Sequence, residues 1–282
     1  MMDINLMSEP KIVITMTSWS KRIKYVAKAI YHFFKTQTIK PDIFYLWLSE
    51  EEFPNKEKDL PEDLLLICEA FGVKIQWVKE NEYCHKRWYV YPKHYNDTVL
   101  CIDDDCTYDK DLIKFAREIK DKKVYTIFNN LTNEMHCEEG IKIKYTRTTG
   151  FSNTIKLSGN SIFPPQTFPL EAIKPENIEL RKKYCKKCDE SWLMPFLIYN
   201  NIPRSYSYKQ KVCYNETDAR FKSTAVFFTS KTTSKVHWKH LQIYIVLRLF
   251  PELMKSWKQV FPAYNDKDFK TKPVDYLITL LK

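Results

Sequence analysis

Glycine is scarce in this chain, which contains only 4 glycines in 282 residues. They stand at Gly72, Gly140, Gly150 and Gly159, so the sequence has neither a Gly-x-Gly-x-x-Gly nor a Gly-x-x-x-x-Gly-Lys motif. Dinucleotide-binding dehydrogenases and P-loop enzymes are therefore disfavoured. Any phosphate group that the protein binds must be met by basic side chains or by a metal ion, because no glycine-rich loop can surround it.

The sequence also lacks a bilayer-spanning stretch of about 20 apolar residues and an export signal ahead of Lys11. We therefore expect a cytoplasmic protein whose 8 cysteines are reduced. Cys185-x-x-Cys188 is half of a zinc site, but no second pair stands at a suitable spacing, which favours ordinary thiols. We expect the Asn-x-Thr sequons at Asn96, Asn130 and Asn215 to be chance matches.

An acidic run is the most informative feature that is present. Asp103, Asp104 and Asp105 directly follow four apolar residues, 99–102. Such an apolar stretch predicts a central strand of a parallel sheet, and ligands bind beyond the carboxyl ends of these strands. Adjacent carboxylates repel one another unless a proton or a hard cation intervenes, and Mg²⁺ binds carboxylates together with substrate phosphates. The run predicts a divalent-metal site, with a solvated turn as the structural alternative.

The pattern around this run is that of an α/β protein. Apolar periodicity predicts strands at 11–16, 42–48, 73–78, 98–102 and 123–128, with helices at 22–35, 63–71, near 85–95 and at 109–119. The alternation indicates a mostly parallel sheet flanked by helices. With 44% hydrophobic residues the chain can form one large core. We expect residues 129–170 to fold over the site on the acceptor side.

Four segments carry a resemblance to a known family. They are IVITMTSWSKRI, QTIKPDIFYLWLSEEEFP, VLCIDDDCTYDKDLI and CDESWLMPFLIYNNIP. In this order they resemble the family 2-like glycosyltransferases of the GT-A fold, which are often bacterial enzymes of surface-polysaccharide or lipopolysaccharide synthesis. The resemblance implies a Rossmann-like GT-A catalytic domain at 1–203. A basic, aromatic-rich extension at 204–282 would pack on it.

The resemblance also implies a reaction. A sugar would pass from a nucleotide diphosphate donor, with a UDP-sugar favoured, to a glycan or lipid-linked acceptor, with inversion at the anomeric carbon. Mn²⁺ or Mg²⁺ would be held by Asp103 and Asp105. Asp104 would lie toward the ribose. The nucleotide pocket would be lined by Thr15, Thr17, Ser18, Arg22 and Ser49, whose alternative roles are strand capping and an exposed cation at a helix start.

A second pair of carboxylates stands at Asp189-Glu190, where the resembling family has two aspartates before x-Trp-Leu. The resemblance makes Glu190 the base that takes the proton of the acceptor hydroxyl. Asp189 is then the natural cap of the helix that follows, since a carboxylate is favoured at a helix N-terminus. The same preference leaves capping as an alternative role for Glu190.

Positive charge is concentrated at the end of the chain. The net charge is +10, and from Pro203 onward fifteen Lys and Arg against six Asp and Glu give +9 of it. Residues 237–250 form a helical candidate within this tail. It could attach the protein to the anionic inner face of a bacterial membrane, close to a lipid-linked acceptor. It could instead pack on the catalytic domain. Nucleic-acid binding is disfavoured, because no known motif for it accompanies the charge.

Two other function classes compete with glycosyl transfer. A sugar-phosphate nucleotidyltransferase uses similar metal chemistry but usually opens with a glycine-rich loop, and here no glycine precedes Gly72. A basic module that binds membranes or nucleic acid without catalysis would not need an acidic run at a strand end. A metal-dependent glycosyltransferase is therefore the preferred interpretation.

Overall fold

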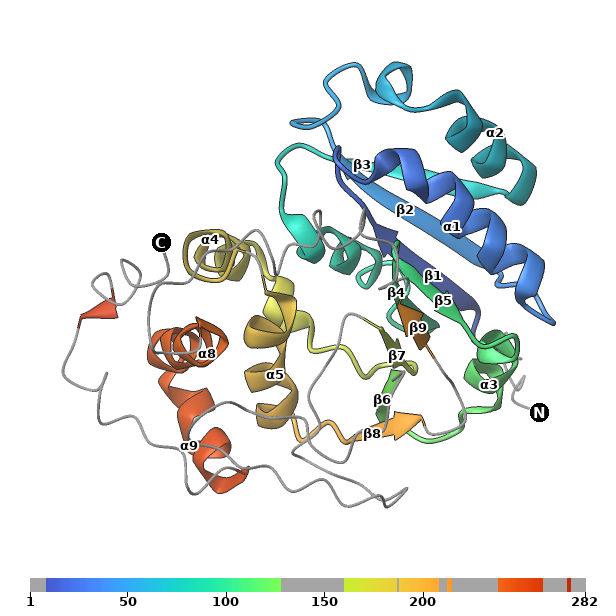
Figure 1. The fold of residues 1–282 in the computed structure, drawn as a ribbon. Coiled ribbons are helices and arrows are strands. Elements are labelled where there is room, and N and C mark those ends of the chain that lie inside the picture. The colour runs from blue at the N-terminus through green and yellow to red at the C-terminus, as the bar shows by residue number, and fades with distance from the viewer. Residues whose placement is uncertain are drawn as a thin grey trace, which may run out of the picture.

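The computed structural model describes residues 9–127, 160–186, 188–207, 212–214, 238–260 and 273–274. Its centre is a seven-stranded sheet with the strand order β3-β2-β1-β4-β7-β6-β8 (Figure 1). Most of the region 129–170, which we expected on the acceptor side, lies outside the described residues.

Four parallel strands form one half of the sheet. Each lies within one residue of its predicted position: β1 (Ile12–Thr17), β2 (Ile43–Ser49), β3 (Val73–Val78) and β4 (Thr98–Asp103). Thr17 at the end of β1 is paired with Trp47 of β2 and with Asp103 of β4. The carboxyl ends of these strands therefore meet at one edge, which is where open α/β sheets bind ligands. The predicted parallel α/β arrangement is confirmed.

The other half of the sheet is mixed. β7 (Ser161–Phe163) runs antiparallel to both β4 and β6 (Val124–Ile127), whereas β8 (Arg204–Ser207) runs parallel to β6. A second, two-stranded sheet pairs β5 (Cys106–Tyr108) with β9 (Val212–Tyr214). The apolar pattern did not predict the short strands β5 and β7. Because β5 begins directly after the acidic run, that run is a tight turn between two strands.

Three amphipathic helices cover one face of the sheet: α1 (Ile23–Thr36), α2 (Glu62–Phe71) and α3 (Leu112–Glu118), with a short 3₁₀ turn, η1 (Lys56–Asp59), before α2. The buried residues of α1 recur every three or four positions and pack on β1 and β2. Helix α2 ends at Gly72, whose φ of 66° is left-handed.

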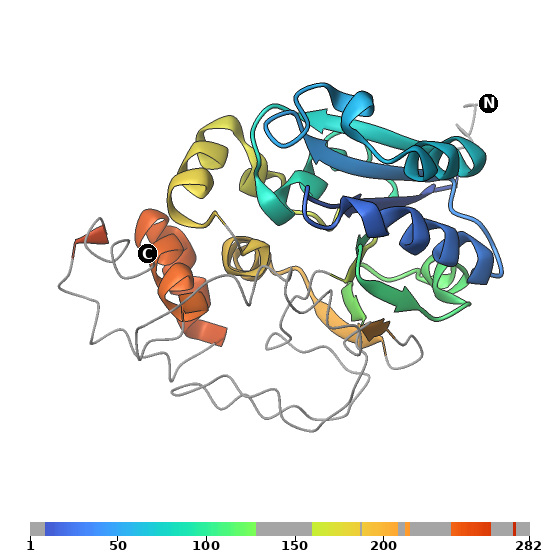
Figure 2. The same cartoon turned by 45° about the horizontal axis from the view of Figure 1, so that its top comes forward.

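On the opposite side, the 3₁₀ segment η2 (Tyr83–Val90) lies against β1 and β2. Beside it lie α4 (Pro175–Tyr184), which follows η3 (Leu170–Ile173), and α5 (Asp189–Tyr199); the last two helices, α8 (Trp238–Leu249) and α9 (Pro251–Val260), pack on α5 (Figures 1 and 2). Residues 191–198 of α5 are all buried. The helix expected near 85–95 is thus replaced by η2, which ends at Val90.

The helical candidate in the basic tail is present as α8. Together with α9 it packs against α5, and residues 244–247 are buried there. The apolar side of this segment therefore contributes to the protein core. Within the described part of the chain, no helix combines the length and the hydropathy needed to cross a bilayer.

Candidate active site

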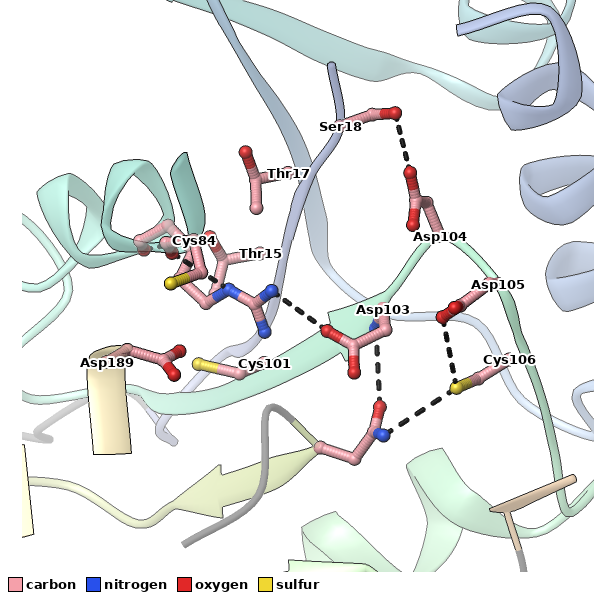
Figure 3. A network of polar contacts seen from close by, with 12 residues as sticks. Thr15, Thr17, Ser18, Cys84, Cys101, Asp103, Asp104, Asp105, Cys106 and Asp189 are labelled. Carbon is pink, nitrogen blue, oxygen red and sulfur yellow. Dashed lines mark hydrogen bonds and ion pairs between the residues drawn. The ribbon is translucent and has the colours of Figure 1, made fainter. Parts of the chain in front are cut away.

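The acidic turn joins the two faces of the sheet. Side chains alternate along a strand, so Asp103 points to the face of η2 and Asp104 to the face of α1. Each carboxylate meets an arginine there: Arg87 Nη2 lies 2.8 Å from Asp103 Oδ1, and Arg22 Nη1 lies 2.8 Å from Asp104 Oδ1. Arg22 also pairs with Asp105. Figure 3 shows how the three aspartates spread apart from the end of β4.

Asp104 ties the loop after β1 to the acidic turn. Its Oδ2 accepts a hydrogen bond of 2.6 Å from Ser18 Oγ, and only 6% of the residue is exposed (Figure 3). Burial raises the pKa of Asp104 to about 6, although the Arg22 guanidinium opposes this rise. Both carboxylate oxygens are thus engaged by the β1 loop, and the predicted ribose contact of Asp104 stays a prediction.

Three side chains at the turn present donor atoms to one point. A carboxylate oxygen of Asp103, one of Asp105 and the sulfur of Cys106 all lie within 4.8 Å of one another. Asn160 Oδ1 and the Tyr108 hydroxyl lie beside them, and the backbone N–H of Asp103 donates to Tyr108 at 2.7 Å. Carboxylate oxygens suit Mn²⁺ and Mg²⁺, while a thiolate suits softer ions. The donor set therefore fits a divalent cation.

The hydroxyls predicted to line the nucleotide pocket are brought to the same edge of the sheet. Each is buried and makes a contact within the protein: Thr15 Oγ1 donates to the Arg87 carbonyl at 2.9 Å, Thr17 Oγ1 to the Trp47 carbonyl at 3.1 Å, and Ser49 Oγ to Glu52 Oε2 at 2.9 Å. These hydrogen bonds hold η2 and the strand ends in place. Their role toward a nucleotide stays a prediction.

A buried lysine next to these strand ends was missed by the sequence reasoning. Lys86 is 1% exposed, and its Nζ donates to the Ser18 carbonyl at 3.1 Å and to Asn81 Oδ1 at 3.2 Å. Glu52 Oε2 is 3.6 Å away. Burial lowers the pKa of Lys86, and the Glu52 carboxylate opposes that change. Lys86 thereby links the loops that follow β1, β2 and β3.

Arg87 stands next to Lys86 on η2 and was also missed. Although its burial favours the neutral form, the carboxylates of Asp103 and Asp189 hold the pKa of Arg87 well above its ordinary value. In the sequence, the run His85-Lys86-Arg87 inside an aromatic segment is the feature that could have indicated these residues. In the structure all three are buried. Periodicity could not show this, because a 3₁₀ segment has no 3.6-residue repeat.

Asp189 and Glu190 form the first turn of α5, directly after Cys188, which occupies the N-cap position predicted for Asp189. The backbone N–H of Glu190 donates to Asp189 Oδ1 at 3.0 Å, so Asp189 satisfies an N–H at the start of the helix. A backbone hydrogen bond also joins Asp189 to the Cys84 thiol. In Figure 3 the Asp189 carboxylate lies near Cys84 and Cys101, on the Asp103 side of the site. Glu190 is half-buried.

Residues 12–201 match the family model described as the glycosyl transferase family 64 domain. The chain belongs to glycosyl transferase family 64. The matched residues contain the acidic turn, both arginines and the start of α5. This match confirms the predicted resemblance to GT-A glycosyltransferases. The matching model is that of family 64, whereas the sequence motifs resembled family 2.

Solved structures of two bacterial proteins are similar to this family 64 chain. For Staphylococcus aureus TarS 1–349, the identity is 15% and the TM-score 0.45, covering 94% of this chain and 77% of the other. For the apo-form glycosyltransferase GlyE of Streptococcus pneumoniae TIGR4, the identity is 12% and the TM-score 0.39, covering 92% and 66%. No curated protein matched the chain by sequence.

Proposed function

We propose that this family 64 glycosyltransferase moves a sugar from a nucleotide diphosphate donor, with UDP-sugars favoured, to a hydroxyl of a glycan or lipid-linked acceptor. The observation that carries the proposal is the acidic turn at the carboxyl edge of the parallel strands. There Asp103 and Asp105 face two buried arginines, Arg22 and Arg87. Carboxylates and guanidinium groups together can bind a cation and a diphosphate.

Asp103 and Asp105 are the residues that would hold Mn²⁺ or Mg²⁺. When bound, the ion supplies Lewis-acid stabilisation of the charge that develops on the departing nucleoside diphosphate. Arg22 pairs with Asp105 and Arg87 with Asp103, so both guanidinium groups would lie beside that charge. Ser18 and Lys86 hold the loop after β1, and this loop carries Arg22 to the acidic turn.

We propose Glu190 as the base that accepts the proton of the acceptor hydroxyl. The Asp189 carboxylate accepts a hydrogen bond from the N–H of Glu190 and lies in the field of Arg87, and the backbone of Asp189 is hydrogen-bonded to the Cys84 thiol. These contacts fit a residue that positions the start of α5. A carboxylate base acting opposite the leaving group gives inversion at the anomeric carbon. The anomeric configuration of the product, measured by NMR, tests this step, and a retained anomer would contradict it.

The binding experiment is titration calorimetry with uridine, guanosine and cytidine diphosphates, with and without Mn²⁺. We expect UDP to bind best and to need the ion. Asp105→Asn removes a ligand charge without changing the side-chain shape, so this variant should lose the metal-dependent part of binding while its thermal unfolding stays normal. Metal-independent UDP binding by both proteins would show that the arginines alone hold the diphosphate.

The transfer experiment compares two isosteric variants, Glu190→Gln and Asp189→Asn, by release of free nucleoside diphosphate. Glu190→Gln should keep donor affinity and lose about 10²- to 10⁴-fold in turnover, which is the usual contribution of a general base. Asp189→Asn should change donor affinity and turnover together. The opposite pattern would make Asp189 the base.

Attachment of the tail to an anionic membrane stays a prediction. Residues 244–247 of α8 are buried against the protein, so they are not part of the surface with which the tail could bind a membrane. Vesicle binding that falls when Lys235, Lys239, Arg248 and Lys255 are changed to Gln would support the tail as the attachment site.

A further inference from the structure

The outer side of α1 carries a row of exposed lysines. Lys24, Lys28 and Lys35 follow one another at spacings of four and seven, and Lys21 lies in the turn before the helix; all four are exposed. Residues at these spacings lie on one side of a helix. Helix α1 is about 21 Å long. In Figure 1 it lies on the outside of the sheet, and no other described element covers its outer side.

The row is purely basic. Between Glu9 and Asp42 the sequence has no acidic residue. None of the four lysines forms an ion pair with a described residue. The neighbouring helix α2 has exposed acidic residues at Glu62, Asp63 and Glu69, so the basic surface ends where α2 begins. Four ammonium groups therefore face solvent along one line.

Aromatic rings lie beside three of the four lysines. Lys21 Nζ is 5.3 Å from the ring centroid of Trp19, Lys24 Nζ is 5.1 Å from that of Tyr25, and Lys35 Nζ is 5.5 Å from that of Tyr31. Tyr31 is 47% exposed and is one of three large hydrophobic side chains exposed among the described residues. Lysines beside Trp and Tyr are typical of helices that lie at a membrane interface.

We propose that this surface, formed by Lys21, Lys24, Lys28, Tyr31 and Lys35, docks the protein onto anionic lipid headgroups. Charge complementarity selects an anionic partner. The surface offers ammonium groups and rings but no carboxylate or amide that could bind sugar hydroxyls, which favours a lipid surface over an acidic glycan. The apolar residues of α1 are buried on the sheet, as those of α8 are against α5, so the α1 surface would dock through its lysines and Tyr31 rather than through an apolar face.

Docking through α1 would set the distance between the active site and the membrane. Lys21 directly precedes Arg22, which binds the acidic turn, so one end of the surface lies at the carboxyl edge of the sheet. An acceptor anchored in the same membrane would then be held near the donor site. The surface itself is independent of the proposed reaction, because it uses none of the residues assigned to binding or transfer.

The test is flotation of the full-length protein with vesicles of phosphatidylglycerol and phosphatidylcholine, or of phosphatidylcholine alone. The K21Q/K24Q/K28Q/K35Q variant is compared with K58Q/K79Q/K93Q/K174Q, which removes the same charge from four other exposed lysines. We expect wild-type binding only to anionic vesicles, weaker at high salt because exposed charges are screened. The α1 variant should bind roughly a thousandfold more weakly and the control within about twofold of wild type.

Transfer to a soluble acceptor separates this proposal from the proposed function. The α1 variant should keep that activity and its thermal unfolding temperature while losing vesicle binding. Equal loss in both quadruple variants would show that only net charge matters, and would overturn the proposal. So would normal vesicle binding by the α1 variant. Retention on an immobilised acidic polysaccharide, without vesicle binding, would replace the lipid partner by a glycan.

Discussion

The two faces of the central sheet are built from different kinds of residues. On the face of α1, α2 and α3, every buried residue of the three helices is apolar, and all three helices are described in full. On the opposite face, η2 and α4 bury His85, Lys86, Arg87 and Arg181. The first face is an ordinary hydrophobic core. The second combines a core with charged side chains that meet in pairs.

This difference shows where the protein uses charge. Buried ion pairs are weak stabilisers, because desolvation offsets most of their attraction. Here these pairs position parts of the site. Arg87 holds Asp103, Lys86 holds the loop after β1, and Arg181 pairs with Glu82 at the start of η2. The acidic turn is paired with one arginine on each face of the sheet, Arg22 on the α1 face and Arg87 on the η2 face. Breaking the first face should therefore change stability alone, whereas breaking the second should also change the site.

The largest change in stability is expected from Arg181→Met. It leaves Glu82, only 6% exposed, without its buried cation, and it removes a guanidinium that lies 5.6 Å from the Trp88 ring centroid. Breaking such a pair costs about 3–5 kcal/mol. Urea unfolding should show this loss, and the double variant Arg181→Met with Glu82→Gln should recover more than half of it. A double variant as unstable as the single one would show that packing on Trp88 dominates.

A change in donor binding at a smaller cost in stability is expected from Lys86→Met. The methylene stem remains, but the link between the Ser18 carbonyl, Asn81 and Glu52 is lost. A displaced β1 loop should weaken binding of the nucleoside diphosphate about tenfold or more. Calorimetric titration measures this, and Lys86→Arg should restore part of the affinity. Unchanged affinity in Lys86→Met would remove Lys86 from the positioning of the site.

Acid is expected to destabilise the protein through His85. Burial first, and then the charge of Arg181, lowers the pKa of His85 well below its ordinary value of 6.5. The contact of Nε2 with the Cys185 carbonyl, at 2.9 Å, opposes this shift, whereas Nδ1 has no hydrogen-bond partner among the described residues that would stabilise a second proton. The unfolded chain takes up a proton near pH 6.5 and the folded protein does not.

Stability should therefore fall as the pH drops below 6.5, by up to about 1.4 kcal/mol per pH unit from this one group. The difference in unfolding free energy between wild type and His85→Gln isolates it, because the amide can still donate to the Cys185 carbonyl. The wild type should lose more stability than the variant between pH 6.5 and pH 5. Parallel pH profiles would show that His85 is protonated in the folded state.

The smallest effect is expected on the apolar face. Ile30 of α1 is fully buried, and Ile30→Val removes one methylene from the core. The expected cost is about 0.5–1.5 kcal/mol in urea unfolding. Donor affinity should not change, in contrast to Lys86→Met. A loss of donor affinity in Ile30→Val would mean that the two faces are not independent.

Much of the fold followed from local pattern. The strands at 12–17, 43–49, 73–78 and 98–103 and the helix at 23–36 are marked by apolar runs and by a 3.6-residue period, and both are written directly in the residues. The acidic turn could be located from the same pattern, because three aspartates directly follow an apolar strand. Strands β5 and β7, of three residues each, are too short to carry such a pattern.

The parallel half of the sheet, the α1 face and the place of the acidic run could be predicted from the sequence, because each depends on residues that are neighbours along the chain. The tertiary structure decided which side chains meet at that run. Arg87 and Asp103 are 16 residues apart, and Ser18 and Asp104 are 86 apart. Their contacts exist because parallel pairing brings the ends of β1 and β4 together and η2 lies across them. Strand alternation then sends Asp103 to one arginine and Asp104 to the other.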